Sequence, residues 1–143
     1  MKIAHISDLH FGRHNPLIID AFLNDLALLK PNIIIISGDL TQRARDAEYQ
    51  QFNLFLKQLP APFLVIPGNH DIPLYDAFSR LFHPFQKYKH YVSSSLESSF
   101  CNDEVNILGV NSVAPFKIKD GNLDKKTLDR IKHYFSANSA QLN

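Results

Sequence analysis

Three short segments of the sequence combine side chains that could hold a metal ion and act on a substrate beside it. They are Asp8-Leu9-His10, Gly38-Asp39 and Gly68-Asn69-His70-Asp71. In an extended segment, two residues separated by one position point to the same side, so Asp8 and His10 could share an ion. Asn69 offers a neutral oxygen ligand, and the carboxylate of Asp71 could orient the ring of His70. Mixed nitrogen and oxygen ligands of this kind suit Mn, Fe or Zn.

Each segment also has an ordinary structural interpretation. An Asp-x-His pair is common in surface loops, Gly-Asp is common in turns, and Asn-His-Asp could form an Asx turn or begin a helix. The interpretation as a site gains weight because each segment directly follows an apolar run. A turn needs no chelating partner, whereas three chelating segments at one edge of a sheet would form a site together.

The apolar runs predict the order strand, helix, strand, helix, strand. Residues 3–6, 33–36 and 63–66 have the composition of short buried strands, and the second is expected to be central and buried on both faces. A first helix opens at Pro16 and stops before Pro31. The apolar faces of the two helices are Ile18, Phe22, Leu26 and Leu29, then Phe52, Phe55, Leu56 and Leu59. This α/β order is typical of parallel βαβ units, whose ligands bind at the carboxyl ends of the strands.

Beyond the third strand the pattern changes. Residues 72–88 predict a helical or irregular excursion. Short apolar runs then predict strands that pair antiparallel, because each run is brief and bounded by polar residues. These runs cover residues 90–92, 96–101 and 105–110.

A last helix follows a turn predicted at Asp120-Gly121. Asp124 is placed to cap the helix, and its apolar face comprises Leu128, Ile131 and Phe135. We expect one domain over residues 1–135 and a polar tail over residues 136–143.

Composition limits the partners and the compartment. The 15 Lys and Arg are balanced by 14 Asp and Glu, which gives a net charge of +1 and makes nucleic acid an unexpected partner. The apolar runs are far shorter than the roughly 20 residues needed to cross a bilayer, so no membrane span is expected. The single Cys101 cannot form an internal disulfide, and the start of the chain lacks an apolar secretory segment. A cytoplasmic protein is therefore expected.

The three polar segments as a set resemble the first three motifs of the calcineurin-like metallophosphoesterases. Ser7-Asp8-Leu9-His10-Phe11-Gly12 and Gly38-Asp39-Leu40-Thr41 are most similar to the bacterial class III cyclic-nucleotide phosphodiesterases. The protein Ser/Thr phosphatases of the superfamily have Asp-Arg-Gly after the second motif and Arg-Gly-Asn-His-Glu as the third, and this sequence has neither. The related DNA repair nucleases usually have Trp at the position of Leu9, so that branch is the less favoured alternative.

The resemblance implies a role for each residue of the three segments. Asp8 and His10 would hold one metal ion, Asn69 would hold a second, and Asp39 would bridge the two. The cofactors would be two divalent transition metals, and a hydroxide bridging them would attack the phosphorus of a small phosphoester. A phosphodiester, in particular a cyclic nucleotide, is the expected substrate. The catalytic residues would be His70, which stabilises or protonates the departing alkoxide, and Asp71, which positions its ring.

The resemblance also implies ligands that these residues do not supply. Members of the family draw three more histidines from later segments, two of them in a Gly-His-x-His motif, and no Gly-His pair occurs in the 143 residues. We therefore expect the N-terminal portion of a four-layer α/β/β/α sandwich, with dimerisation as one way to cover an exposed sheet face. The alternatives are a truncated metal-binding chain with little or no catalysis and a non-enzymatic scaffold.

Overall fold

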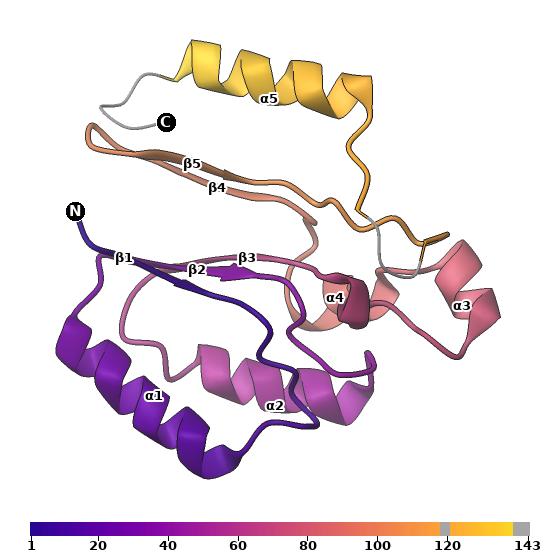
Figure 1. Ribbon diagram of the computed structural model, residues 1–143, viewed down its shortest axis with the longest axis horizontal. Helices are drawn as coiled ribbons and strands as arrows, with labels where there is room; N and C mark the ends of the chain where they lie inside the picture. Colours follow the sequence, from indigo (N-terminus) through magenta and orange to yellow (C-terminus); the bar gives the residue numbers. More distant parts are fainter. Residues whose placement is uncertain (118–120, 139–143) are drawn as a thin grey trace.

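The computed structural model describes residues 1–117 and 121–138 as a layered α/β structure (Figure 1). In chain order its elements are β1 (Ile3–Ile6), α1 (Pro16–Leu29), β2 (Ile33–Ser37), α2 (Asp46–Leu56), β3 (Phe63–Ile66), a 3-10 helix (Asn69–Asp71), α3 (Ala77–Phe82), α4 (Gln86–Tyr91), β4 (Ser98–Cys101), β5 (Asn106–Gly109) and α5 (Lys125–Ala137). The first three strands form a parallel sheet in the order β1-β2-β3, and β4 pairs antiparallel with β5.

Four layers are visible in Figure 1. Helices α1 and α2 cover one face of the parallel sheet, the β4-β5 hairpin lies over the other face, and α5 lies outside the hairpin. The predicted α/β class and βαβαβ start are confirmed. The order of the layers also agrees with the N-terminal portion of an α/β/β/α sandwich.

Local signals determine where α1 begins and ends. Pro16 occupies the first turn, and the side chain of Asn15 caps the helix by accepting a hydrogen bond from the backbone N–H of Leu17 at 3.0 Å. At the other end, Lys30 adopts a left-handed conformation with φ 50°, and its N–H binds the carbonyl oxygen of Leu26. The helix predicted to open at Pro16 is therefore confirmed.

The core lies between the parallel sheet and α2. Ile34 and Ile36 of β2 are fully buried, and Phe52 and Phe55 of α2 belong to the same cluster. The prediction of a central strand is therefore confirmed, since β2 pairs with a neighbour on each side. Among the described residues, no helix is long and apolar enough to cross a membrane.

One expectation for the middle of the chain is wrong. The predicted strand over residues 90–92 is absent: His90 lies in α4, and Val92 follows that helix. Tyr88 is buried and Tyr91 stacks on Tyr49 with ring centroids 5.6 Å apart, so apolar residues three positions apart face the core, as in a helix. The predicted strands over residues 96–101 and 105–110 are confirmed as the antiparallel pair β4 and β5.

The last helix begins as expected. Asp124 caps α5 by accepting a hydrogen bond from the backbone N–H of Thr127 at 2.8 Å. The helix continues through Ala137, two residues into the predicted tail. The rest of that tail from residue 139 onward, and Asp120 of the predicted turn, lie outside the described residues.

Two glycines allow the carboxyl ends of β2 and β3 to approach closely. Gly38 has φ +79°, a conformation that L side chains rarely adopt. A Cβ on Gly68 would lie 2.2 Å from the backbone nitrogen of Asp39. Since that contact is backbone, only glycine at position 68 permits it.

The side chain of Asp71 holds the same two loops together from within. It is fully buried and accepts hydrogen bonds from the backbone N–H of Leu40 at 3.1 Å, Thr41 at 2.8 Å and Gly68 at 2.8 Å. The Thr41 hydroxyl donates to it as well, at 2.9 Å. Burial raises the pKa of Asp71 to about 6, while these hydrogen bonds act in the opposite direction. The carboxylate therefore connects the loops that follow β2 and β3.

We predict that Asp71→Asn destabilises the chain by about 2–4 kcal/mol, because an amide NH₂ would face backbone donors that the carboxylate now satisfies. The free energy of unfolding from urea denaturation, followed by circular dichroism, measures this change. Asp25→Asn, on the exposed side of α1, is the matched control and should change the value by less than about 0.5 kcal/mol. Equal stability of the two variants would contradict the role of Asp71.

Candidate metal centre

The first two polar segments lie side by side because the pairing of β1 and β2 continues beyond the strands. The backbone N–H of His10 binds the carbonyl oxygen of Asp39 at 3.0 Å, and the N–H of Phe11 binds that of Leu40 at 2.9 Å. Two backbone contacts thus bring the loop after β1 against the loop after β2.

The backbone of the first segment is not extended, contrary to expectation. Asp8 and His10 have φ 57° and 44°, and Asp39 has φ 52°, all in the left-handed region. Such conformations are uncommon for residues other than glycine and often occur at functional sites. The two side chains still meet, with Nε2 of His10 3.7 Å from Oδ1 of Asp8. The left-handed backbone, and not the alternation of side chains along a strand, therefore brings the side chains of Asp8 and His10 together.

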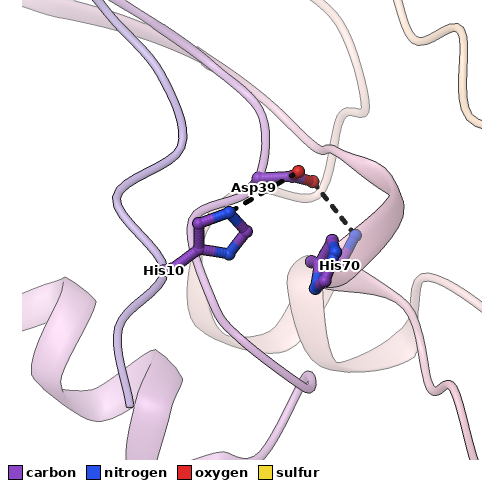
Figure 2. A group of neighbouring side chains, drawn as sticks. All are labelled: His10, Asp39 and His70. Carbon is purple, nitrogen blue, oxygen red and sulfur yellow. Dashed lines mark hydrogen bonds and ion pairs between the residues drawn. The ribbon is translucent and has the colours of Figure 1, made fainter. Parts of the chain in front are cut away.

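Asp39 is the central side chain of the group (Figure 2). Its Oδ1 accepts a hydrogen bond from the backbone N–H of His70 at 3.0 Å, and its Oδ2 lies 4.0 Å from Nε2 of His10. The rings of His10 and His70 meet edge to face with centroids 4.8 Å apart. Potential ligand atoms of these three residues all lie within 4.8 Å of one another.

The spacing and chemistry of these donors fit a metal ion. Two atoms that each bind one ion at roughly 2.1 Å lie about 3.0–4.2 Å apart, depending on the angle between them. Nε2 of His10 lies 3.7 Å from Asp8 and 4.0 Å from Asp39, so both separations are longer than a hydrogen bond and fall in that range. The Nδ1 of His10 is buried without a hydrogen-bond partner among the described residues.

A main-chain carbonyl fixes the ring of His70. Nδ1 of His70 lies 2.9 Å from the carbonyl oxygen of Gln42. Because a carbonyl can only accept, Nδ1 must carry a hydrogen, which leaves Nε2 for the site. The structure therefore differs from the expectation that Asp71 orients this ring, since the four contacts of the Asp71 carboxylate are with the loops around it.

A cavity of about 300 Å³ opens beside the cluster. Its wall includes Asp8, Asp39 and Asn69 from the polar segments, and residues 112–114 and Lys117 from the segment after β5. Asp39 therefore belongs both to the cavity wall and to the cluster with the two histidines. The structure thus brings all three predicted segments to the carboxyl edge of the parallel sheet.

Sequence reasoning missed the residues that act through the main chain or from later in the chain. Gln42 contributes its carbonyl oxygen, so its side-chain type gives no signal. Thr41 is fully buried and donates to Asp71, which its place directly after Gly38-Asp39-Leu40 could have indicated. Lys117 reaches the cavity from a segment with no recognisable motif.

Several curated proteins are similar to this chain over part of its length. A probable glycerophosphodiester phosphodiesterase GpdQ from Arcobacter nitrofigilis is 39% identical over 64 residues, which cover 45% of this chain and 22% of that protein. The glycerophosphodiester phosphodiesterase GpdQ of Enterobacter lignolyticus is 35% identical over 82 residues, or 50% of this chain and 30% of that protein.

A third relative bears a different name. The UDP-2,3-diacylglucosamine pyrophosphatase LpxG of Chlamydia trachomatis is 35% identical over 81 residues, which cover 52% of this chain and 24% of that protein. In all three cases the match spans less than a third of the relative. The model of the calcineurin-like phosphoesterase family matches residues 1–140. This match covers nearly the whole chain, including every residue of the cluster, and so the chain belongs to the calcineurin-like phosphoesterase family.

Proposed function

We propose that this chain carries part of the active site of a metal-dependent phosphoesterase that hydrolyses phosphodiesters. The observation that supports this function most directly is the cluster of His10, Asp39 and His70, whose potential ligand atoms lie within 4.8 Å of one another. The cluster lies at the carboxyl edge of a parallel sheet, where α/β folds bind ligands. The names of two relatives, both phosphodiesterases, support the same reaction class.

The proposed metal ligands are Asp8, His10, Asp39 and Asn69. Asp8 and His10 would hold one divalent transition metal ion (Mn, Fe or Zn), Asn69 a second, and Asp39 both. The two oxygens of Asp39 face different neighbours, Nε2 of His10 and the backbone of His70, which supports a bridging role. When bound, the ions supply positive charge to the phosphoryl oxygens and make a nucleophilic hydroxide available at neutral pH.

His70 is the proposed general acid. In the imidazolium form the ring donates from Nδ1 to the carbonyl of Gln42 and presents the proton on Nε2 to the site. That proton would pass to the leaving oxygen as its bond to phosphorus breaks. The products are an alcohol and a phosphomonoester, or, from a cyclic phosphodiester, one phosphomonoester with a new hydroxyl group. Asp71 is a positioning residue in this proposal, because it holds the loops of Asp39 and His70 at a fixed separation.

Two observations bear on the class of substrate. The resemblance of the first motifs favours a cyclic nucleotide, whereas the relatives bear the names of a glycerophosphodiester phosphodiesterase and a UDP-2,3-diacylglucosamine pyrophosphatase. We propose a phosphodiester as the substrate, which agrees with the cyclic nucleotide and with the glycerophosphodiester but differs from the phosphoanhydride that a pyrophosphatase cleaves. The cyclic nucleotide is one member of the set to be tested.

Three further features complete the proposal. The site residues would belong to one domain over residues 1–135, in a cytoplasmic protein. A second copy of this chain is the proposed partner for apolar sheet surface that the β4-β5 hairpin leaves uncovered.

We predict that His10→Ala and Asp39→Asn each weaken binding of Mn²⁺ or Zn²⁺ by at least about tenfold, because each removes a charged or nitrogen ligand. Isothermal titration calorimetry on the full chain, with Co²⁺ absorption as a second readout, measures the affinity. His90→Ala, an exposed histidine on α4, is the matched control and should bind metal as the original chain does. If the control loses as much affinity as the site variants, the ligand assignment is wrong.

We predict that His70→Ala lowers kcat by about 10²–10⁴-fold for phosphodiesters with alkyl leaving groups, which need a proton to depart. The loss should be much smaller for bis(4-nitrophenyl) phosphate, because nitrophenolate leaves without protonation. Hydrolysis of both types, of glycerophosphodiesters and of adenosine 3′,5′-cyclic phosphate measures the effect.

The size of the loss tests the role of His70 apart from the metal ligands. A wild-type rate in His70→Ala on the alkyl substrates would rule out the general acid. If the unsubstituted chain binds metal but hydrolyses none of these substrates, it is a metal-binding chain with little catalysis, and the proposed activity fails for this chain.

A further inference from the structure

A group of exposed apolar side chains surrounds α3. Phe78 and Phe82 lie on this helix with ring centroids 4.8 Å apart, and 67% and 58% of their surfaces are exposed. Groups of exposed apolar side chains of this kind often mark interaction sites. The group, here named the α3 patch, comprises Leu74, Tyr75, Phe78, Leu81, Phe82 and Phe116.

The α3 patch is braced by one arginine. Arg80 donates hydrogen bonds from Nε to the carbonyl of Pro115 at 2.8 Å, from Nη1 to that of Pro73 at 3.0 Å, and from Nη2 to that of Lys117 at 2.9 Å. These bonds fix the segment of Phe116, which is 81% exposed, beside α3. Arg80 thus holds the backbone of Pro73, Pro115 and Lys117 against α3, next to the apolar side chains of the patch.

A basic pocket adjoins the α3 patch. It is a cavity of about 270 Å³, and Leu74 and Tyr75 belong to both its wall and the patch. The rest of the wall includes the cationic residues Arg43, Arg45 and Lys87. The guanidinium of Arg43 lies 5.2 Å from the centre of the Tyr75 ring, within range of a cation–π contact.

The acidic groups near the pocket already have partners. Asp46 binds the ammonium of Lys87 at 2.7 Å, and Asp76 caps α3 by accepting hydrogen bonds from the N–H and hydroxyl of Ser79. Among the described residues, neither arginine of the pocket forms an ion pair. The pocket wall therefore has three cationic side chains and one carboxylate, that of Asp76, beside exposed aromatic rings.

We propose that the α3 patch and the basic pocket form a docking surface for membranes that contain anionic phospholipids. Aromatic and leucine side chains insert at the boundary between headgroups and acyl chains, and Lys and Arg beside them pair with lipid phosphates. A second copy of this chain fits less well. A two-fold contact through the patch would set the aromatic side chains of the two copies against each other and would supply no anion to the basic pocket.

The docking surface also adjoins the metal centre. Ala114 and Lys117 line the cavity beside Asp39, and Phe116 of the same segment belongs to the patch. Docking would therefore place the cavity close to lipid headgroups. The consequence that the substrate is a phosphodiester presented at a membrane surface rests on the proposed function, whereas docking itself does not.

Co-sedimentation of the full chain with vesicles tests the surface without metal or substrate. Vesicles of phosphatidylcholine and phosphatidylglycerol at 3:1 should bind the chain at low salt, and pure phosphatidylcholine should bind it several-fold more weakly. Phe78→Glu should lower the partition coefficient by at least about tenfold, and Arg43→Gln by about fivefold. Leu28→Glu, with the same change in charge at an 80% exposed position on α1, should have little effect.

Circular dichroism checks that each variant folds. Failure of the original chain to bind anionic vesicles, or an equal loss in Leu28→Glu, overturns the proposal. A Phe78→Glu variant that abolishes self-association in sedimentation equilibrium, in a chain that binds no vesicles, assigns the patch to a second copy. Failure of hydrolysis with normal vesicle binding would refute the proposed function and leave the docking surface standing.

Discussion

The buried carboxylate of Asp71 is the interaction on which the candidate site depends. It has no exposure to solvent and is surrounded by backbone N–H groups from the loops after β2 and β3. Burying a charge is costly unless donors surround it, and here four donors do so. Because the donors come from both loops, the buried carboxylate is stable only while the two loops stay together. The positions of Asp39 and His70, which lie on these loops, therefore depend on the contacts of Asp71.

Much of the fold could be predicted because its signals are local. The proline before α1, the run of isoleucines in β2 and the aspartate before α5 each act through nearby backbone or through burial on both faces. The strand predicted over residues 90–92 was wrong because three residues cannot reveal a helical period. Its true period becomes visible only when Tyr88 and the stacking of Tyr91 on Tyr49 are included. That stacking joins residues 42 positions apart, beyond the reach of any local pattern.

The candidate site was predictable in its residue types and not in its geometry. Three polar segments after three parallel strands had to share an edge of the sheet, and His10, Asp39 and His70 do meet there. The left-handed backbone at Asp8 and His10 could not be foreseen, since aspartate and histidine adopt it more often than most residues but no local pattern shows at which positions they do so. The use of Asp71 as an internal brace was also hidden, because its four donors come mostly from main chain.

The carbonyl of Gln42 gives the site an unusual form of mutational robustness. Any residue at position 42 presents the same oxygen to Nδ1 of His70, provided the loop keeps its path. Sequence drift at this position is therefore compatible with an unchanged ring orientation. An alanine scan would pass over Gln42, although its main chain fixes the tautomer of the histidine. The orientation of this ring therefore depends on the path of the backbone at position 42 and not on the type of side chain there.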